Sequence, residues 1–419
     1  MQKLIIKGKR ELKGKISVSG SKNSTLPILA ASILANEVCL KNIPLVKDIF
    51  TMVELLNFIG LKTKFNKKKN LVEIKNNEKN INTLAPYKLV KTMRAGVLVL
   101  GSLLTKYRVA KVSLPGGCAI GSRPVNLHLF ALKKLGAKIK IKDGYIFAEA
   151  KKGLKGTIIR FPSISVGATE NALLASINAK GRTILKNCAI EPEINDLIIF
   201  LKKLGASINL KGRTITISER KLKKTKIIHE VVFDRIELGT YMIAGALLAK
   251  NKMIINKINP KIVKTEIDLL KRTGVKIKKS KTSLTIKSSK NLKKINISTK
   301  PYPGFPTDLQ AQFMVLMTQI NGESKIREDI FENRFMHVPE LKRMGAKIEI
   351  KNRTAFILGP TKLNGAEVMA TDLRASVCLV LAGLIAENRT ILNRIYHLDR
   401  GYELLEKKLL NCKAKIQRI

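Results

Sequence analysis

The sequence contains no tryptophan, and only 5% of its 419 residues are aromatic. Proteins that bind single-stranded nucleic acid stack the bases on aromatic side chains, so this scarcity argues against such a function. Acidic residues are also few, since 31 Asp and Glu face 79 Lys and Arg and the formal net charge is +48. Because the basic residues are spread over every segment, we interpret the charge as a property of the whole surface. A basic nucleic-acid-binding repeat protein remains the alternative from a different class.

Cysteine is limited to five residues, which form no Cys-x-x-Cys pair and no cluster with histidine at metal-ligand spacing. We therefore expect a reducing compartment and no metal. Residues 1–10 lack the apolar core of a signal peptide. The longest apolar runs, such as 375–386, are shorter than the ~20 residues of a membrane helix. These features predict a cytoplasmic protein that does not bind or cross a membrane.

A motif that repeats six times organises the chain. It reads LKKLGAKIKI in its second copy, and the copies lie at 56–65, 132–141, 201–210, 270–279, 341–350 and, in degenerate form, 409–418. The aligned residues are spaced by 76, 69, 69, 71 and 68 positions, and they are Gly60, Gly136, Gly205, Gly274, Gly345 and Lys413. We expect each glycine to be the left-handed residue that ends a helix. The chain is therefore predicted to consist of six units of one fold.

Each unit is predicted to fold in the order βαβαββ. A helix of small and apolar residues is followed by a short strand, such as 183–187, 253–257 or 390–394, and then by a charged amphipathic helix that ends at the aligned glycine. Two alternating strands complete the unit, joined in one copy at Asp143-Gly144, a strong hairpin signal. The apolar helices are expected at 26–35, 92–104, 169–179, 239–249, 309–320 and 373–386.

The two helices of a unit should differ in burial. The first is apolar on nearly all sides and should lie inside, whereas the second has one apolar face and should lie outside. Helices inside with sheets around them reverse the layout of a TIM barrel. Six units divide most naturally into two similar domains of three. We place the first domain at 22–232, and the second at 233–419 together with the N-terminal strands in 1–21.

Lys22 and Asn23 lie in the segment SGSKN, directly before the first apolar helix. A helix N-terminus favours an anion, so Lys22 at this place would suit a phosphate or carboxylate. An ordinary solvated loop lysine explains the motif equally well, and the motif alone leaves both interpretations open.

Cys118 lies in the loop 114–126, which contains three glycines and two prolines. Its neighbours Gly117 and Ala119 offer no apolar surroundings, and Arg123 would lower its pKa toward the reactive thiolate. We therefore interpret Cys118 as functional. The remaining cysteines lie in apolar stretches and are interpreted as core residues: Cys39, Cys188, Cys378 and Cys412.

Several arginines stand where loops lead into helices, namely Arg94, Arg334, Arg374 and Arg400. Surface ion pairs worth ~0–1 kcal/mol are the ordinary role of such residues. Their equivalent places in the repeat nevertheless favour convergence on one cleft, where together with Lys22 and Arg123 they would hold a small polyanion.

Asp308 begins the fifth apolar helix, after a segment with three prolines. It could be a helix-capping acid worth ~1 kcal/mol, a role that Thr307 could share. Opposite a basic anion site it could instead be a general base. The residues alone leave both roles open.

Taken in order along the whole chain, these motifs closely resemble UDP-N-acetylglucosamine 1-carboxyvinyltransferases, a family of enolpyruvyl transferases. The motifs are SGSKN (19–23), LPGGCAIGSRPVNLH (114–128), SVGATEN (165–171), PGFPTDLQAQ (303–312), FENRFMHVPEL (331–341), ATDLRAS (370–376) and HLDRGYE (397–403). The resemblance implies an inside-out α/β barrel of two three-repeat domains with the active site between them. It also implies transfer of the enolpyruvyl group of phosphoenolpyruvate to the 3′-hydroxyl of UDP-N-acetylglucosamine, with release of phosphate. That reaction is the first committed step of peptidoglycan precursor synthesis, and it uses no cofactor or metal.

The resemblance also implies roles for individual residues. Cys118 would donate a proton, form adducts with phosphoenolpyruvate and react with fosfomycin. Asp308 would take the proton of the sugar hydroxyl, and Asp372 would handle the proton of the intermediate. Lys22 and Arg400 would also be catalytic. The phosphoenolpyruvate contacts would be Lys22, Asn23, Arg123, Arg334, Arg374 and Arg400. The nucleotide-sugar contacts would be Arg94, Arg123, Pro124, Val125, Asn126, Leu127, Ser165, Val166, Gly167, Asp308 and Ile330.

Asn126 and Ser163 depart from the family pattern, because some members carry Asp and Lys at these places. Within enzymes the alternative is a 5-enolpyruvylshikimate-3-phosphate synthase, which shares the sixfold architecture, although PGGCAIG and FENRFMHV favour the sugar-nucleotide enzymes. A relative that has lost its activity is a further alternative, but every chemical position named above is occupied. The expected partners are the two small-molecule substrates and no nucleic acid. The oligomeric state stays open, with a monomer favoured.

Overall fold

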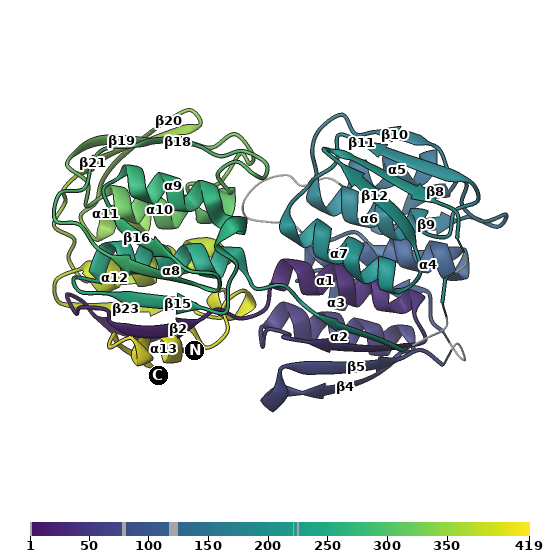
Figure 1. The fold of residues 1–419 in the computed structure, drawn as a ribbon, viewed down its shortest axis with the longest axis horizontal. Helices are drawn as coiled ribbons and strands as arrows, with labels where there is room; N and C mark the ends of the chain where they lie inside the picture. Colours follow the sequence, from purple (N-terminus) through teal and green to yellow (C-terminus); the bar gives the residue numbers. More distant parts are fainter. Residues whose placement is uncertain (1, 78–80, 117–124, 221, 224–225) are drawn as a thin grey trace. The chain divides into compact units, whose positions relative to one another are not determined.

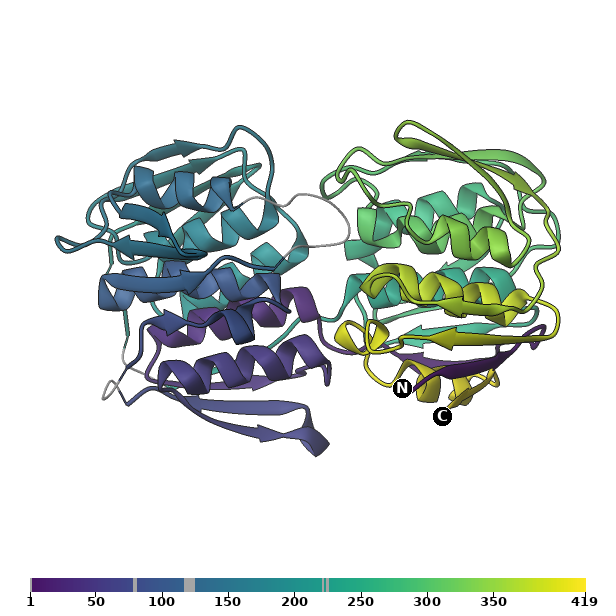
Figure 2. The same ribbon diagram turned by 180° about the vertical axis from the view of Figure 1, so that it is seen from behind.

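The computed structural model describes residues 2–77, 81–116, 125–220, 222–223 and 226–419. The chain forms two compact units. We call residues 2–19 and 233–419 the terminal unit, and the described residues of 20–116 and 125–232 the central unit. In each unit, helices lie inside and sheets lie around them (Figures 1 and 2). Each unit has its own apolar core.

Six four-stranded sheets account for the strands in the described part of the chain, and all six share one strand order. In the central unit they are β14 (Lys226–Glu230), β3 (Glu37–Lys41), β5 (Leu71–Lys75) and β4 (Lys62–Asn66); β6 (Leu84–Ala85), β7 (Val109–Ser113), β9 (Tyr145–Glu149) and β8 (Lys138–Lys142); and β10 (Ile158–Arg160), β11 (Arg182–Lys186), β13 (Thr214–Ser218) and β12 (Ser207–Lys211). In the terminal unit they are β2 (Gly14–Ser17), β15 (Met253–Asn256), β17 (Ser283–Lys287) and β16 (Lys276–Lys279); β18 (Asn296–Ser298), β19 (Gly322–Arg327), β21 (Thr354–Gly359) and β20 (Lys347–Lys351); and β22 (Glu367–Met369), β23 (Arg389–Asn393), β1 (Leu4–Lys7) and β24 (Lys415–Arg418).

In every sheet the first two strands are parallel and the other two pairings are antiparallel. Three strands, β1, β2 and β14, pair with strands that lie far from them in the sequence. β2 precedes the first inner helix but pairs with β15, and β14 precedes the fourth inner helix but pairs with β3. β1 supplies the third strand of the sixth sheet, between β23 and β24. The first and last segments of the chain therefore belong to one repeat.

The inner helices carry the apolar sequences, as predicted. They are α1 (Lys22–Ala31), α4 (Val99–Tyr107), α6 (Val166–Ser176), α8 (Arg235–Leu248), α10 (Gln310–Met317) and α12 (Leu373–Ile385). All eight residues of α10 are buried. The outer helices are α2 (Lys47–Ile59), α5 (Asn126–Lys134), α7 (Pro192–Lys203), α9 (Lys264–Arg272), α11 (Val338–Arg343) and α13 (Leu405–Asn411), with the short α3 (Tyr87–Val90) besides. The 3-10 helices are η1 (Ser32–Leu34), η2 (Lys67–Lys69), η3 (Arg94–Leu98), η4 (Pro260–Val263), η5 (Thr307–Leu309) and η6 (Leu398–Arg400).

Three inner helices begin earlier than predicted, and the predicted starts at 26, 169 and 239 are wrong. α1, α6 and α8 begin at Lys22, Val166 and Arg235. The reason is side-chain capping: Ser21 accepts from the amide of Ser24, Ser165 from that of Ala168, and Asp234 from those of Ile236 and Glu237. Polar first turns that look like loop sequence are therefore helical.

The predicted left-handed positions are confirmed. The five aligned glycines have φ between 94° and 114°, and Lys413 in the sixth unit has φ 71°. The hairpin at Asp143-Gly144 joins β8 to β9 with φ values of 51° and 74°, which only a few residue types tolerate. The sixth unit therefore keeps the turn although it lacks the glycine. Within the described residues, no helix is both long and apolar enough to cross a bilayer.

Candidate active site

In the terminal unit, the carboxylate of Asp308 joins two buried arginines. Nη2 of Arg334 donates to Oδ1 across 2.5 Å, and Nε of Arg374 donates to Oδ2 across 3.2 Å. Arg334 is 5% exposed and Arg374 is 3% exposed, whereas the Asp308 side chain keeps 27% exposure. The capping role considered for Asp308 is not observed, because neither η5 nor α10 has a side-chain cap. Two charge-assisted hydrogen bonds hold the carboxylate instead.

Arg374 lies in the first turn of α12, which Asp372 caps. Oδ1 of Asp372 accepts from the amide of Arg374 at 2.7 Å and from that of Ala375 at 3.0 Å. Burial lowers the pKa of Arg374, but the charges of Asp308 and its neighbours outweigh this effect and raise the pKa above its ordinary value. Nη1 and Nη2 of Arg374 are buried and have no hydrogen-bond partner among the described residues. The guanidinium therefore keeps donors for an anion, and its other neighbour is the ring of Tyr402, whose centroid lies 5.5 Å away.

Glu328 connects the segment after β19 to Asp308's own helix. Its side chain is 1% exposed and accepts hydrogen bonds from Thr307, at 2.8 Å, and from the amide of Ile330, at 2.9 Å. The amide of Phe331 donates to the same carboxylate at 3.1 Å. Glu328 thus fixes Ile330 and the start of the segment that carries Arg334. Sequence reasoning missed this role, because Glu328 lies outside the motifs that were singled out.

Two histidines belong to the same region of the terminal unit. His337 is 1% exposed, and burial together with the charge of Arg334 lowers its pKa to about 4 although Asp372 acts in the opposite sense. Its Nε2 has no hydrogen-bond partner among the described residues. Burial and Arg400 lower the pKa of His397. Both imidazoles are therefore neutral near pH 7, and sequence reasoning missed both.

Arg400 lies in η6 and is half-buried. Its sequence neighbour Asp399 is engaged elsewhere, because both carboxylate oxygens accept from Arg418, at 2.7 and 3.1 Å. The adjacency of Asp399 and Arg400 in the sequence therefore does not make them an ion pair.

In the central unit, Lys22 is the first residue of α1 and is 7% exposed. Its Nζ lies 3.2 Å from Oδ2 of Asp48, which is also buried. Asn23 follows on the same turn and is half-buried. A buried lysine needs such a partner, since unpaired charge is costly in the interior. The sequence singled out Lys22 but missed Asp48, which lies 26 positions away.

The SVGATEN segment of the central unit surrounds His128. Ser165 caps α6, and a Cβ on Gly167 would lie 3.1 Å from Cε1 of His128, so any side chain there would press on the imidazole. Burial and the charge of Arg94 lower the pKa of His128 to about 3, and its Nδ1 lies 3.1 Å from the amide nitrogen of Asn171. His128 therefore connects Arg94 with the segment Ser165–Val166–Gly167.

The remaining candidates of the central unit lie at the start of α5. Val125 precedes the helix and is buried, Asn126 is exposed and Leu127 is half-buried. Cys118, Arg123 and Pro124 lie outside the described residues. No group of three metal-ligating side chains occurs in the part of the chain that the structure describes.

The candidates thus form separate sets within the two units. The terminal unit brings Asp308, Arg334, Arg374 and Asp372 together, with Ile330 held nearby through Glu328. The central unit carries Lys22 with Asn23, and Arg94 with 165–167 around His128. Each set contains a buried cation, Lys22 in the central unit and Arg334 and Arg374 in the terminal unit, which suits an anionic ligand.

Comparisons with known proteins identify the family of the chain. The family profile of EPSP synthase (3-phosphoshikimate 1-carboxyvinyltransferase) matches residues 6–409. The UDP-N-acetylglucosamine 1-carboxyvinyltransferase of Pelagibacter ubique is 55% identical over 420 residues, and that of Rickettsia prowazekii is 50% identical over 422 residues, each over the full length of both chains.

Solved structures confirm the predicted fold class. The enolpyruvyl transferase NikO from Streptomyces tendae is 25% identical and superposes with a TM-score of 0.89, with 100% of this chain and 99% of that chain covered. EPSP synthase from Acinetobacter baumannii, at 17% identity and full coverage of both chains, has a TM-score of 0.77 and shares the fold alone. The chain belongs to the EPSP synthase family and, within it, to the UDP-N-acetylglucosamine 1-carboxyvinyltransferases.

Proposed function

We propose that this chain transfers the enolpyruvyl group of phosphoenolpyruvate to the 3′-hydroxyl of UDP-N-acetylglucosamine and releases inorganic phosphate. The full-length identity to carboxyvinyltransferases supports this reaction over transfer to shikimate 3-phosphate. The product would enter peptidoglycan synthesis, and since both substrates are metabolites of the cytoplasm, the enzyme would act there. The two catalytic domains would be 22–232, and 233–419 with 1–21.

The observation that carries the proposal is the state of Arg374. Its two terminal nitrogens are buried without partners among the described residues, while its Nε binds the carboxylate of Asp308. A buried guanidinium with free donors is an anion-binding group, and phosphoenolpyruvate carries a phosphate and a carboxylate. Arg334, Arg400, Arg123, Lys22 and Asn23 would complete the anion site.

In the addition step, the sugar oxygen attacks C2 of phosphoenolpyruvate and its proton moves to Asp308. C3 gains a proton from Cys118, so the double bond becomes a tetrahedral phosphate ketal. Hydrogen bonds from two arginines stabilise the charged carboxylate of Asp308. When the anionic substrate takes up arginine donors, the carboxylate loses part of that stabilisation and accepts the proton more readily. The same contact that binds phosphoenolpyruvate would thus activate the base.

In the elimination step, the bond from C2 to the phosphate oxygen breaks and C3 returns a proton. The cations Lys22 and Arg400 would stabilise the leaving phosphate. Asp372 would accept the C3 proton; its Oδ1 is engaged in capping α12, which leaves Oδ2 for this task. Arg94 and the segments 123–127 and 165–167, with Ile330, would hold the nucleotide sugar.

A phosphate-release assay tests the proposal. With phosphoenolpyruvate and UDP-N-acetylglucosamine together, phosphate should appear continuously, and neither substrate alone should support turnover. Equal turnover with shikimate 3-phosphate in place of the nucleotide sugar would contradict the assignment.

A further inference from the structure

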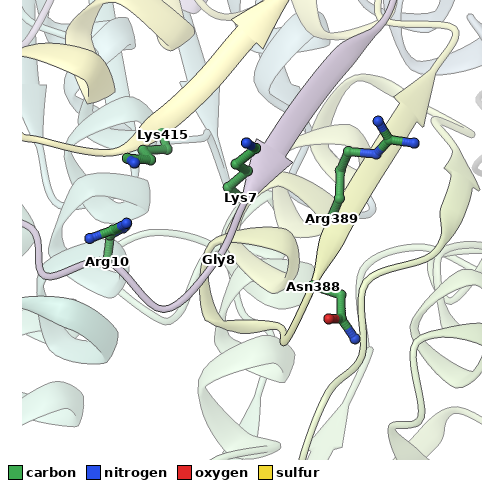
Figure 3. A pocket seen from close by; sticks show the side chains of 6 residues that line it. All are labelled: Lys7, Gly8, Arg10, Asn388, Arg389 and Lys415. Carbon is green, nitrogen blue, oxygen red and sulfur yellow. The ribbon is translucent and has the colours of Figure 1, made fainter.

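We propose that a basic hollow on the sixth sheet of the terminal unit binds a small soluble anion that carries two or more phosphate charges. The hollow has a volume of about 310 Å³ and is lined by Lys7, Gly8, Arg10, Asn388, Arg389 and Lys415 (Figure 3). Five of these six residues have side chains that can donate hydrogen bonds, and four of these five side chains are cations.

Strand pairing places three of the cations in one row. Lys7 is the last residue of β1, and it stands opposite Arg389 on β23 and opposite Lys415 on β24. In Figure 3, Lys7 accordingly lies between the other two. Like charges directly opposite one another on neighbouring strands are destabilising. An anion in the hollow would turn this repulsion into attraction.

None of the four cations has an ion pair or hydrogen bond through its side chain within the described residues. The acid next in sequence, Glu387, is already used, because it binds Lys362 at 2.7 Å and also Lys9. Those two contacts lower the pKa of Glu387, Lys362 more than Lys9. The cations of the hollow are therefore available to a ligand.

The other repeats provide an internal comparison, since the same row exists in each sheet. In three of them the row contains an acid: Glu37 beside Lys75, Glu149 beside Lys138, and Glu323 in line with Lys347. In a fourth sheet Arg182 stands beside serines. In the fifth sheet the row contains two opposed lysines, Lys276 and Lys287, and no arginine. Lysine abundance alone does not explain the hollow, because two of its four cations are arginines, although arginine supplies only 19 of the 79 basic residues.

The hollow is distinct from the candidate active site. Asn388 and Arg389 follow the C-terminus of α12, whereas Arg374 lies in its first turn. Thirteen helical residues separate the two ends, about 20 Å at 1.5 Å per residue. Gly8 forms part of the wall, and a Cβ there would lie 2.0 Å from the carbonyl oxygen of Ala386, so no side chain can occupy this place.

The lining defines the ligand's chemistry. Arginine forks bind phosphate oxygens in pairs, lysines add point charges, and the amide of Asn388 can donate a hydrogen bond. The volume is at the lower end of small-molecule sites, which suits an anion the size of pyrophosphate better than a polymer.

Inorganic pyrophosphate is the probe, and its binding is measured by calorimetry at ~0.15 M salt, where diffuse surface charge is screened. An Arg374→Gln background weakens binding at the candidate active site. The test variant is Lys7→Gln/Arg389→Gln, and the matched control is Lys276→Gln/Lys287→Gln, which neutralises an opposed lysine pair on β16 and β17. All four positions are exposed, so the substitutions should leave the fold intact.

We expect pyrophosphate to bind in the Arg374→Gln background, the test variant to weaken that binding about tenfold or more, and the control to change it less than about twofold. Absence of binding in that background, or an equal loss in the control, would overturn the proposal. A separate measurement uses vesicles of phosphatidylcholine and phosphatidylglycerol. Vesicle binding that depends on Lys7 and Arg389, without binding of free pyrophosphate, would also overturn it, since the ligand would then be a lipid headgroup.

Discussion

Arg374 donates from Nε to Oδ2 of Asp308 across 3.2 Å, while its two terminal nitrogens stay buried without partners in the described part of the chain. One guanidinium therefore faces both the proposed base and the place proposed for the anionic substrate. Because Arg334 holds the other oxygen of the same carboxylate, substrate binding and base strength become linked through two side chains. A catalytic role and a purely structural role of Asp308 therefore predict different effects of its replacement.

Replacing Asp308 by asparagine should lower turnover by ~10²–10⁴ with little change in the unfolding midpoint, because the amide can still accept from an arginine but cannot take a proton. Steady-state rates and thermal unfolding check this. Glu406→Gln is the control, since Glu406 is also a carboxylate bound to an arginine, Arg418, at 2.9 Å. If both variants lose stability alike and Asp308→Asn keeps full turnover, Asp308 merely holds its arginines.

Cys118 should be the one cysteine that reacts rapidly with alkylating agents and with fosfomycin. The other four are buried. Burial raises the pKa of Cys188 to about 12 and that of Cys412 to about 11, and it also raises the pKa of Cys378. Thiols protonated to this degree are poor nucleophiles. Peptide mapping after brief treatment locates the adduct.

The variant Cys118→Asp should stay active and resist fosfomycin, because aspartic acid can donate a proton but offers no sulfur. UDP-N-acetylglucosamine should speed labelling of the native chain. A first adduct on another cysteine, or inactivation of Cys118→Asp by fosfomycin, would disprove this role.

Lys413→Gly should stabilise the protein by about 0.5–1 kcal/mol. Lys413 has φ 71°, at the place where the other five units have glycine, and the left-handed conformation costs a side-chain-bearing residue ~1–2 kcal/mol. The reverse change, Gly136→Ala, should destabilise by about 1 kcal/mol or more, because φ is 95° there although the space around a Cβ is open. Urea unfolding measures both free energies, and a loss of stability in Lys413→Gly would refute the strain argument.

The contribution of Glu170 to stability should fall as the pH rises from about 5 to 8. Burial, reinforced by the charges of Glu193 and Glu191, raises the pKa of Glu170 from 4.5 to about 8. Between these values Glu170 holds a proton in the folded chain that it has lost in the unfolded chain, so its contribution to the free energy of unfolding decreases by up to about 1.4 kcal/mol per pH unit and levels off above pH 8.

Glu170→Gln removes this titration. The free energy of unfolding of the native chain minus that of the variant should therefore decrease by up to about 1.4 kcal/mol per pH unit over this range, because the buried histidines titrate alike in both proteins. Identical slopes for the two proteins in urea unfolding would show that Glu170 titrates normally.

The repeat made most of the fold predictable, because six copies reinforce each other: the apolar helices, the left-handed turns and the hairpins all follow from local chemistry. The helix starts at Lys22, Val166 and Arg235 did not, since capping turns resemble loops in sequence. The roles of Asp48 and Glu328 could not be predicted either, because they depend on partners that only the folded chain brings close.

The predicted site residues differ in the same way. Motif residues such as Arg374 stand out in sequence because of their neighbours. The buried imidazoles of His128 and His337 gave no comparable signal, although each lies within a quoted motif. Their surroundings come from other segments, so burial and the resulting pKa values become visible only in three dimensions.

The proposed enolpyruvyl transfer is tested most directly by NMR, with phosphoenolpyruvate labelled with ¹³C at C2 and UDP-N-acetylglucosamine as the substrates. The label should appear in an enolpyruvyl ether of the nucleotide sugar, in an amount equal to the phosphate released. With shikimate 3-phosphate as the acceptor, no enolpyruvyl ether should form. Phosphate release without the ether, or ether formation with shikimate 3-phosphate alone, would contradict the proposed transfer.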